Sequence, residues 1–144
     1  MVNGPEDPSR RDVGAVEWDV IDWAATEREV RRLRQRIFKA TWDGDWPTVR
    51  NLQKLLLRSR SNTLVSVRQV TQRNAGRKTP GIDGEVALTS QARAEIAVRV
   101  HHGTRTWRPR AVKRVYIPKA GDRTKLRALG IPTRVAYRAS PQAR

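Results

Sequence analysis

NAGRKTPGIDG, residues 74–84, separates two halves of the chain that differ in their sequence pattern. Pro80 suits the first central position of a turn, and Gly81 is expected to supply the positive φ angle that a type II turn requires. Asp83 and Gly84 predict a second reversal directly after it. Residues 79–84, TPGIDG, are therefore predicted to be a compact double turn between a helical N-terminal half and a C-terminal half that contains strands.

Two cations, Arg77 and Lys78, precede the double turn without a nearby acidic residue. Cations beside exposed backbone N–H groups suit a phosphate chain, so we predict that both residues bind RNA. The same eleven residues are also compatible with an ordinary basic loop, because short motifs have little specificity.

Charge is distributed unevenly along the 144 residues, whose formal net charge is +16. Residues 1–22 carry six acidic and two basic side chains, whereas residues 46–144 carry 22 basic and four acidic ones. A polyanionic partner explains this bias most simply, and the excess of arginine over lysine favours RNA or single strands. A membrane surface is the weaker alternative, because the bases are spread over several elements.

The composition also excludes several classes of protein. A hydrophobic content of 38% supports a modest core, and no run approaches the roughly 20 apolar residues of a membrane span. Residues 1–12 contain no apolar segment of the kind found in signal peptides. The chain has no cysteine, which excludes disulfides and thiolate metal ligands and is compatible with a reducing cytoplasm, so the predicted location is cytoplasmic.

Three helices are predicted before the double turn, after a disordered segment over residues 1–17. Asp22 is a candidate N-cap for a helix over 23–41, and Asp45 is a candidate N-cap for a second helix over 46–58. The turn between them predicts an antiparallel helical hairpin. A third helix is predicted over 61–73.

Apolar stripes define the buried faces that we expect for these helices. In the second helix the predicted buried residues are Val49, Leu52, Leu55 and Leu56, and in the third they are Leu64, Val67 and Val70. We interpret four tryptophans as core or hairpin-end packing rather than as base-stacking platforms, because they flank these stripes: Trp18, Trp23, Trp42 and Trp46.

Basic residues cover the polar faces of the same helices. The first helix carries six cations that are compatible with either a solvated or an RNA-facing surface: Arg28, Arg31, Arg32, Arg34, Arg36 and Lys39. Four arginines are predicted to line the polar side of the third helix, to bind RNA and to continue into the double turn: Arg58, Arg60, Arg68 and Arg73.

A short helix and a β-hairpin are predicted after the double turn. Thr89 or Ser90 can cap a helix that reaches about Val100. His101 and His102 follow it with no acidic or cysteine partner at ligand spacing, so we expect them to be exposed and to bind no metal.

Residues 111–117 and 125–131 have the alternation typical of paired strands. Pro118 is expected to end the first strand, and Gly121 with Asp122 is expected to form the loop. Six bases make this hairpin a cationic finger: Lys113, Arg114, Lys119, Arg123, Lys125 and Arg127.

Two long blocks resemble one family. Residues 18–84 resemble the N-terminal region of group II intron-encoded reverse transcriptase/maturases, which are proteins of mobile elements. Residues 107–133, WRPRAVKRVYIPKAGDRTKLRALGIPT, resemble the first polymerase block of the same family. Two long blocks in the right order are far more specific than either motif alone.

The resemblance implies a mainly α fold with a β-hairpin (α+β). Residues 18–103 would form the RNA-binding N-terminal helical domain, 104–133 part of the fingers of a right-hand polymerase, and 134–144 a loose or aberrant tail. Lys119 and Arg127 are the positions expected to contact the phosphates of the incoming nucleotide, and Lys113 and Arg114 are expected to contact RNA. The implied partners are group II intron RNA and template, and the parent enzyme would use Mg²⁺ for RNA-directed DNA synthesis while also assisting splicing.

The sequence departs from this family after Thr133. It reads RVAYRASPQAR where the family continues into the palm, so the palm aspartates and the YADD box are missing, and the hypothesis is a reading frame truncated or frameshifted near Thr133. The remaining carboxylates are scattered, so we predict no metal or cofactor site, and RNA binding without polymerisation. The alternative is a free-standing basic structural RNA-binding protein, which gives no reason for the hairpin motifs. The oligomeric state stays open.

Overall fold

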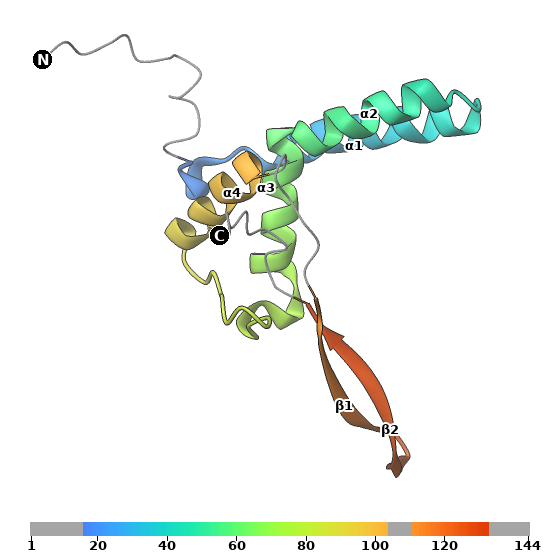
Figure 1. Ribbon diagram of the computed structural model, residues 1–144. Coiled ribbons are helices and arrows are strands. Elements are labelled where there is room, and N and C mark those ends of the chain that lie inside the picture. The colour runs from blue at the N-terminus through green and yellow to red at the C-terminus, as the bar shows by residue number, and fades with distance from the viewer. Residues whose placement is uncertain (1–15, 104–110, 133–144) are drawn as a thin grey trace, which may run out of the picture.

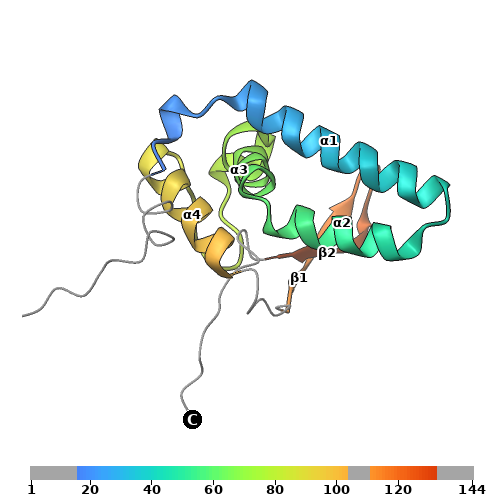
Figure 2. The ribbon, with the colours of Figure 1, turned by 90° about the horizontal axis from the view of Figure 1, so that it is seen from above.

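Helices dominate the computed structural model, which describes residues 16–103 and 111–132. The elements in chain order are η2 (Trp18–Val20), α1 (Trp23–Trp42), α2 (Trp46–Arg58), α3 (Arg60–Arg68), η3 (Gln69–Arg73), η4 (Ala75–Lys78), α4 (Ser90–Gly103), β1 (Lys113–Lys119) and β2 (Asp122–Ile131). The antiparallel pair α1 and α2, here called the arm, and the β-hairpin project in different directions from a body that contains α3 and α4 (Figure 1). Seen from above, α3 lies between the arm and α4 (Figure 2). This arrangement confirms the predicted mainly α fold with a small β part.

Local capping explains where the two helices of the arm begin. The Asp22 carboxylate accepts a hydrogen bond from the backbone N–H of Ala25 at 2.9 Å, and Asp45 accepts one from that of Thr48 at 3.1 Å. Hydrogen bonds from Thr48 also lower the pKa of the Asp45 carboxyl, which keeps the cap ionised. Gly44 between the helices has a φ of 71°, which a side chain would disfavour. Both predicted caps and the helical hairpin are therefore confirmed.

The arm has one narrow apolar seam. Ala40, Val49 and Leu52 are buried in it, and Leu33 and Ile37 pack against them. Two helices alone can share only one seam, so apolar residues elsewhere on the arm face solvent.

Three sequence interpretations are wrong for this reason. Leu55 was expected to be buried but is 49% exposed, and Trp42 and Trp46, expected to pack at the end of the hairpin, are 83% and 56% exposed. Trp18, in contrast, is only 3% exposed, so its interpretation as a core residue is confirmed.

The main core lies in the body. Its buried residues come from η2, α3, the segment before α4 and α4 itself: Trp18, Leu64, Val67, Ala87, Ala94, Ile96 and Ala97. The third helix begins one residue earlier than predicted, because the Ser59 hydroxyl accepts a hydrogen bond from the backbone N–H of Asn62 at 3.3 Å. The body thus joins segments from both sides of the double turn.

The third helix does not continue regularly to Arg73. From Gln69 it widens into a π-helical turn, and the N–H of Asn74 donates to the Gln69 carbonyl oxygen at 2.8 Å. Thr71, which is 1% exposed, donates its hydroxyl to the Val67 carbonyl oxygen at 2.7 Å. This bond gives the Val67 carbonyl oxygen a side-chain partner. The spacing of apolar residues does not predict such a local effect.

The double turn is only partly as predicted. Gly84 has a φ of 70° and donates its N–H to the Gly81 carbonyl oxygen at 3.1 Å, which confirms the second reversal. The expected positive φ at Gly81 is wrong, since Gly81 is not among the described glycines with positive φ, and a 3₁₀ turn, η4, precedes Pro80. The Ile82 N–H donates to the Pro132 carbonyl oxygen at 3.3 Å, so the turn contacts the base of the β-hairpin.

The helix α4 runs three residues beyond its predicted end at Val100. Thr89 caps it, since its hydroxyl accepts the N–H of Ala92 at 3.2 Å. The prediction that His101 is exposed is wrong: the ring is half-buried with Nδ1 3.4 Å from the Thr63 hydroxyl. Burial, together with the charges of His102 and Arg60, lowers the pKa of His101.

The hairpin pairs Lys113 with Ile131 at its base and Ile117 with Arg127 farther out. The prediction that Pro118 ends the first strand is wrong, because β1 continues to Lys119 with an irregular register between these two residues. Proline is tolerated there because both strands are edges and one row of N–H positions faces outward. The tail segments over 1–15 and 133–144, the linker over 104–110 and the side chain of Arg123 lie outside the described parts of the structure.

Candidate nucleic-acid interface

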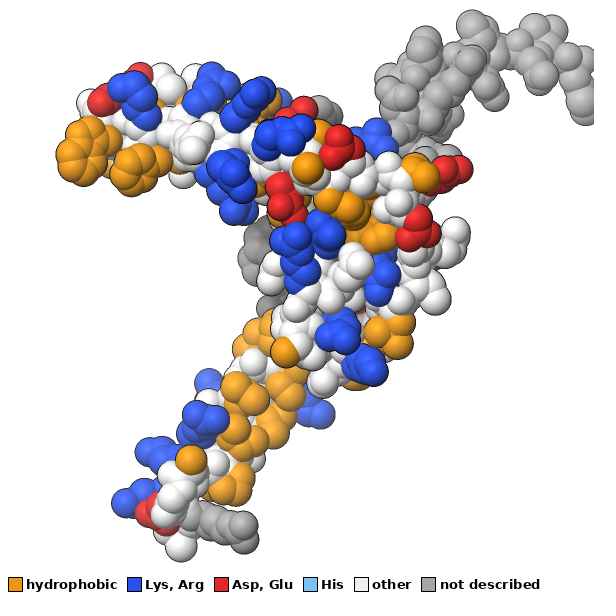
Figure 3. Space-filling view, turned by 180° about the vertical axis from the view of Figure 1, so that it is seen from behind, with side chains coloured by type: hydrophobic (Ala, Val, Ile, Leu, Met, Phe, Trp, Pro, Cys, Tyr) orange, Lys and Arg blue, Asp and Glu red, His pale blue; other side chains and the backbone are white. Residues whose placement is uncertain are grey.

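A concave groove lies where the arm meets the body (Figure 3). Its volume is about 970 Å³, with α1 on one side and α3 with η3 on the other. Lys and Arg side chains gather around this corner in the space-filling view. The residues that line it are Glu27, Val30, Arg31, Arg34, Gln35, Phe38, Val65, Ser66, Gln69, Val70 and Arg73.

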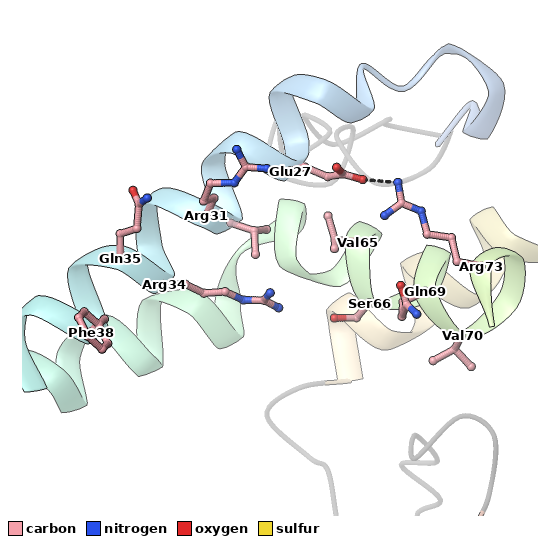
Figure 4. Close-up of a pocket in the computed structure, with 11 residues that line it drawn as sticks. Glu27, Arg31, Arg34, Gln35, Phe38, Val65, Ser66, Gln69, Val70 and Arg73 are labelled. Carbon is pink, nitrogen blue, oxygen red and sulfur yellow. Dashed lines mark hydrogen bonds and ion pairs between the residues drawn. The ribbon is translucent and has the colours of Figure 1, made fainter.

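Two cations on α1, Arg31 and Arg34, define the basic side of this groove (Figure 4). They lie one turn apart beside the buried stripe of α1, so the packing of Val30 and Leu33 directs them to the groove edge. Both are exposed, and neither forms an ion pair within residues 16–103 and 111–132. Unpaired guanidinium groups in a concave surface are suited to bidentate phosphate contacts.

Glu27 is the acidic group of the groove. Its Oε1 accepts hydrogen bonds from Arg73 at 2.7 Å and from Arg68 at 3.2 Å. The guanidinium of Arg68 also lies over the Trp23 ring, 4.2 Å from its centroid. These contacts fasten the start of α1 to α3 and η3, and they occupy two arginines that the sequence assigned to RNA.

Replacing Glu27 with glutamine is expected to lower the free energy of unfolding by about 1–2 kcal/mol, because the partly buried guanidinium of Arg68 and the exposed one of Arg73 lose their charged acceptor. RNA binding should not weaken, since Arg73 is released. The measurement is thermal unfolding of the full chain together with RNA binding. Glu95→Gln is the matched control, because Glu95 is an exposed carboxylate on α4 that bonds Gln91. Equal stability of the two variants would contradict a structural role for Glu27.

The β-hairpin carries a second set of cations. Lys113, Arg114, Lys119 and Arg127 are all exposed. Arg127 is paired with Ile117, whereas Lys119 is paired with Asp122 across the irregular register. The two expected nucleotide contacts therefore lie on opposite strands of one hairpin, beyond its middle.

Sequence comparison relates this architecture to known proteins. Residues 18–100 match the family model described as the N-terminal domain of reverse transcriptase, and this match covers more than half of the chain. The chain belongs to this reverse transcriptase N-terminal domain family. The matched range includes both walls of the groove and all four α-helices except the end of α4.

Two curated proteins are similar to this reverse transcriptase N-terminal domain. Maturase-like protein 1 of Euglena gracilis is 27% identical over 92 residues, which are 64% of this chain and 20% of that protein. Protein YkfC of Escherichia coli (strain K12) is 33% identical over 96 residues, which are 65% of this chain and 25% of that protein. The chain thus spans a quarter or less of the length of these relatives.

The predicted RNA contacts do not form one surface in this reverse transcriptase N-terminal domain. Among them only Arg73 lines the groove. Arg60 lies in a different depression beside Ser61 and Leu64, while Arg77 and Lys78 are exposed on η4. Arg58 is the exposed last residue of α2.

The sequence pattern does not by itself assign four residues of the groove to a site: Arg31, Arg34, Gln35 and Phe38. The available signal was their spacing, because residues three, four and seven apart share one face of a helix. Which face of α1 borders the groove depends on where α3 crosses α1, and helical spacing does not predict that crossing point.

Metal and membrane features complete the description. The described residues contain no cluster of three or more histidine, cysteine or acidic side chains that could hold a metal ion. Within the same residues, no helix has the length and apolar character needed to cross a membrane.

Proposed function

We propose that this chain binds RNA as the N-terminal portion of a reverse transcriptase of the maturase type. The observation that carries the proposal is the groove between α1 and α3, in which Arg31 and Arg34 have no carboxylate partner among the described residues. The formal net charge of +16 supports a polyanionic partner. Membership of a polymerase family supports a nucleic acid as that partner.

Structured intron RNA and the template are the RNA classes that we propose. This step is supported by the resemblance to group II intron proteins and by the similarity to a relative named as maturase-like. The parent activity would be RNA-directed DNA synthesis with Mg²⁺. We propose that Lys119 and Arg127 contact the phosphates of the incoming nucleotide, because two cations on one exposed hairpin can clamp a triphosphate.

The test compares binding of the 144-residue chain to a group II intron RNA and to an unrelated RNA of the same length at matched salt. Preference for the intron RNA is expected, because a concave surface responds to RNA shape as well as to charge. Titrating the salt should give a log–log slope near −0.7 for each single-strand phosphate neutralised. Equal affinity for the two RNAs would favour the alternative, a free-standing basic structural RNA-binding protein.

The hairpin provides an internal control for that experiment. Lys119→Ala and Arg127→Ala should change RNA affinity by less than about twofold if these residues serve the nucleotide, since one exposed charge contributes little. A large loss of RNA affinity in either variant would assign the hairpin to the RNA interface instead.

A further inference from the structure

Two aromatic side chains are exposed on the outer part of α1. Phe38 is 68% exposed and Trp42 is 83% exposed. Their ring centroids are 6.4 Å apart and the ring planes are inclined by 31°. The rings therefore form one aromatic surface at the end of the arm, where hydrophobic side chains are visible in the space-filling view (Figure 3).

These rings continue the basic side of the groove. Arg31, Gln35, Phe38 and Trp42 follow one another at helical spacings of four, three and four residues, and Arg34 borders the same face. Phe38 itself lines the groove with Arg34 and Gln35 (Figure 4). At 1.5 Å per residue, the distance along α1 from Arg31 to Trp42 is about 16 Å. We call the face formed by these five residues the aromatic track.

Packing among residues 16–103 and 111–132 does not explain the aromatic track. The seam of the arm is filled by Ala40, Val49 and Leu52, and Trp42 loses little water-accessible area on folding. A neighbouring pair of large exposed apolar side chains is typical of a binding surface rather than of a stabilising contact. The rings are thus available to a partner.

We infer that the aromatic track binds unpaired nucleotides of RNA. Arg31 and Arg34 would contact the phosphates, and Phe38 with Trp42 would stack against bases. Proteins that bind single strands combine cations, which contact the phosphates, with aromatic rings, on which the bases stack. This stacking does not depend on the identity of the base. The inference rests on the proposed function and specifies its substrate class as a single-stranded region.

Charge favours RNA over a second copy of the chain as the occupant. The α1 helix carries five arginines, none of which has an ion-pair partner within the described residues. The acidic residues at the end of the arm are engaged locally, with Asp43 paired to Lys39 at 3.0 Å and Asp45 capping α2. Contact between two such arms would bring like charges together, whereas a phosphate chain would neutralise them.

The experiment measures binding of the full chain to a labelled 12-nucleotide single-stranded RNA and to the same sequence as a duplex. Trp42→Leu should weaken single-strand binding at least fivefold, because base stacking on an aromatic ring contributes about 1–3 kcal/mol. Trp42→Phe should keep most of the affinity, and duplex binding should change less than twofold. Trp46→Ala is the control, since Trp46 is an exposed tryptophan of the same arm that lies at the start of α2 and outside the aromatic track. All variants should unfold at the wild-type temperature.

Three outcomes would overturn the inference. The first is equal loss of affinity in Trp42→Leu and Trp46→Ala, and the second is wild-type affinity in Trp42→Leu. The third is a wild-type dimer in sedimentation velocity that Trp42→Leu dissociates, which would assign the rings to a second copy. Wild-type chain that binds neither RNA would instead refute the proposed function, so the two failures are distinguishable.

Discussion

Replacing Trp18 with alanine is expected to lower the free energy of unfolding by about 3–5 kcal/mol, because it removes a large side chain from a core that cannot collapse around the gap. Trp18 is 3% exposed and packs with residues of α3 and α4. Its ring centroid is 4.9 Å from that of Trp23, which in turn supports Arg68. Small domains have only about 5–15 kcal/mol of stability, so urea unfolding should show a clear shift of the midpoint.

The variant Trp18→Phe distinguishes the contribution of the packed ring from that of the polar indole N–H. The Trp18 indole nitrogen is buried without a hydrogen-bond partner among the described residues. Trp18→Phe keeps most of the ring and removes this unsatisfied donor, so its loss should be much smaller than that of alanine. Equal destabilisation by alanine and phenylalanine would contradict this expectation and show that the core needs the complete indole ring system.

Replacing Arg31 and Arg34 together with glutamine is expected to weaken RNA binding by about ten- to a hundredfold, because charged hydrogen bonds contribute about 1.5–3 kcal/mol each before solvent screening. Both side chains are exposed, so the fold should be unaffected. The salt dependence should fall with the affinity, and the log–log slope should become smaller by about 1.4 for two lost phosphate contacts. Equilibrium binding over a series of salt concentrations measures both quantities.

The matched control for this pair is Arg28→Gln with Arg32→Gln. These arginines lie on the same helix, and replacing both removes the same two positive charges, but they do not line the groove. The control should lose less than about threefold in affinity, because long-range attraction between exposed charges is screened within about 8–10 Å. If both double variants lose the same affinity, binding depends on net charge alone and the groove is not the interface.

Local sequence rules predicted most of the secondary structure. Asp22 and Asp45 cap helices as expected because an N-cap bond spans only three residues. The prediction failed for Gln69–Arg73, where a threonine hydroxyl competes for a helix carbonyl, and at Pro118, where a sheet with only two strands in the described part of the chain permits proline. Apolar periodicity describes neither cause.

The candidate site was less predictable than the fold. Arg68 and Arg73 are predicted to bind RNA, and the structure adds that both bond Glu27, which precedes them by 41 and 46 residues. Trp42 was expected to pack but is exposed, because no third helix among the described residues covers the end of the arm. Whether a charged or aromatic residue is available to a partner depends on its neighbours in space, which helical periodicity does not identify.

The amino-acid sequence by itself determined the helices, the turn at Gly84, the hairpin and the concentration of positive charge, because caps, turns and alternation act over a few residues. The tertiary structure alone decided that Arg31 and Arg34 line a groove, that Arg68 and Arg73 bond Glu27, and that Phe38 and Trp42 face solvent. The physical reason is the crossing of α1 over α3, which pairs charges distant in sequence and leaves others unpaired.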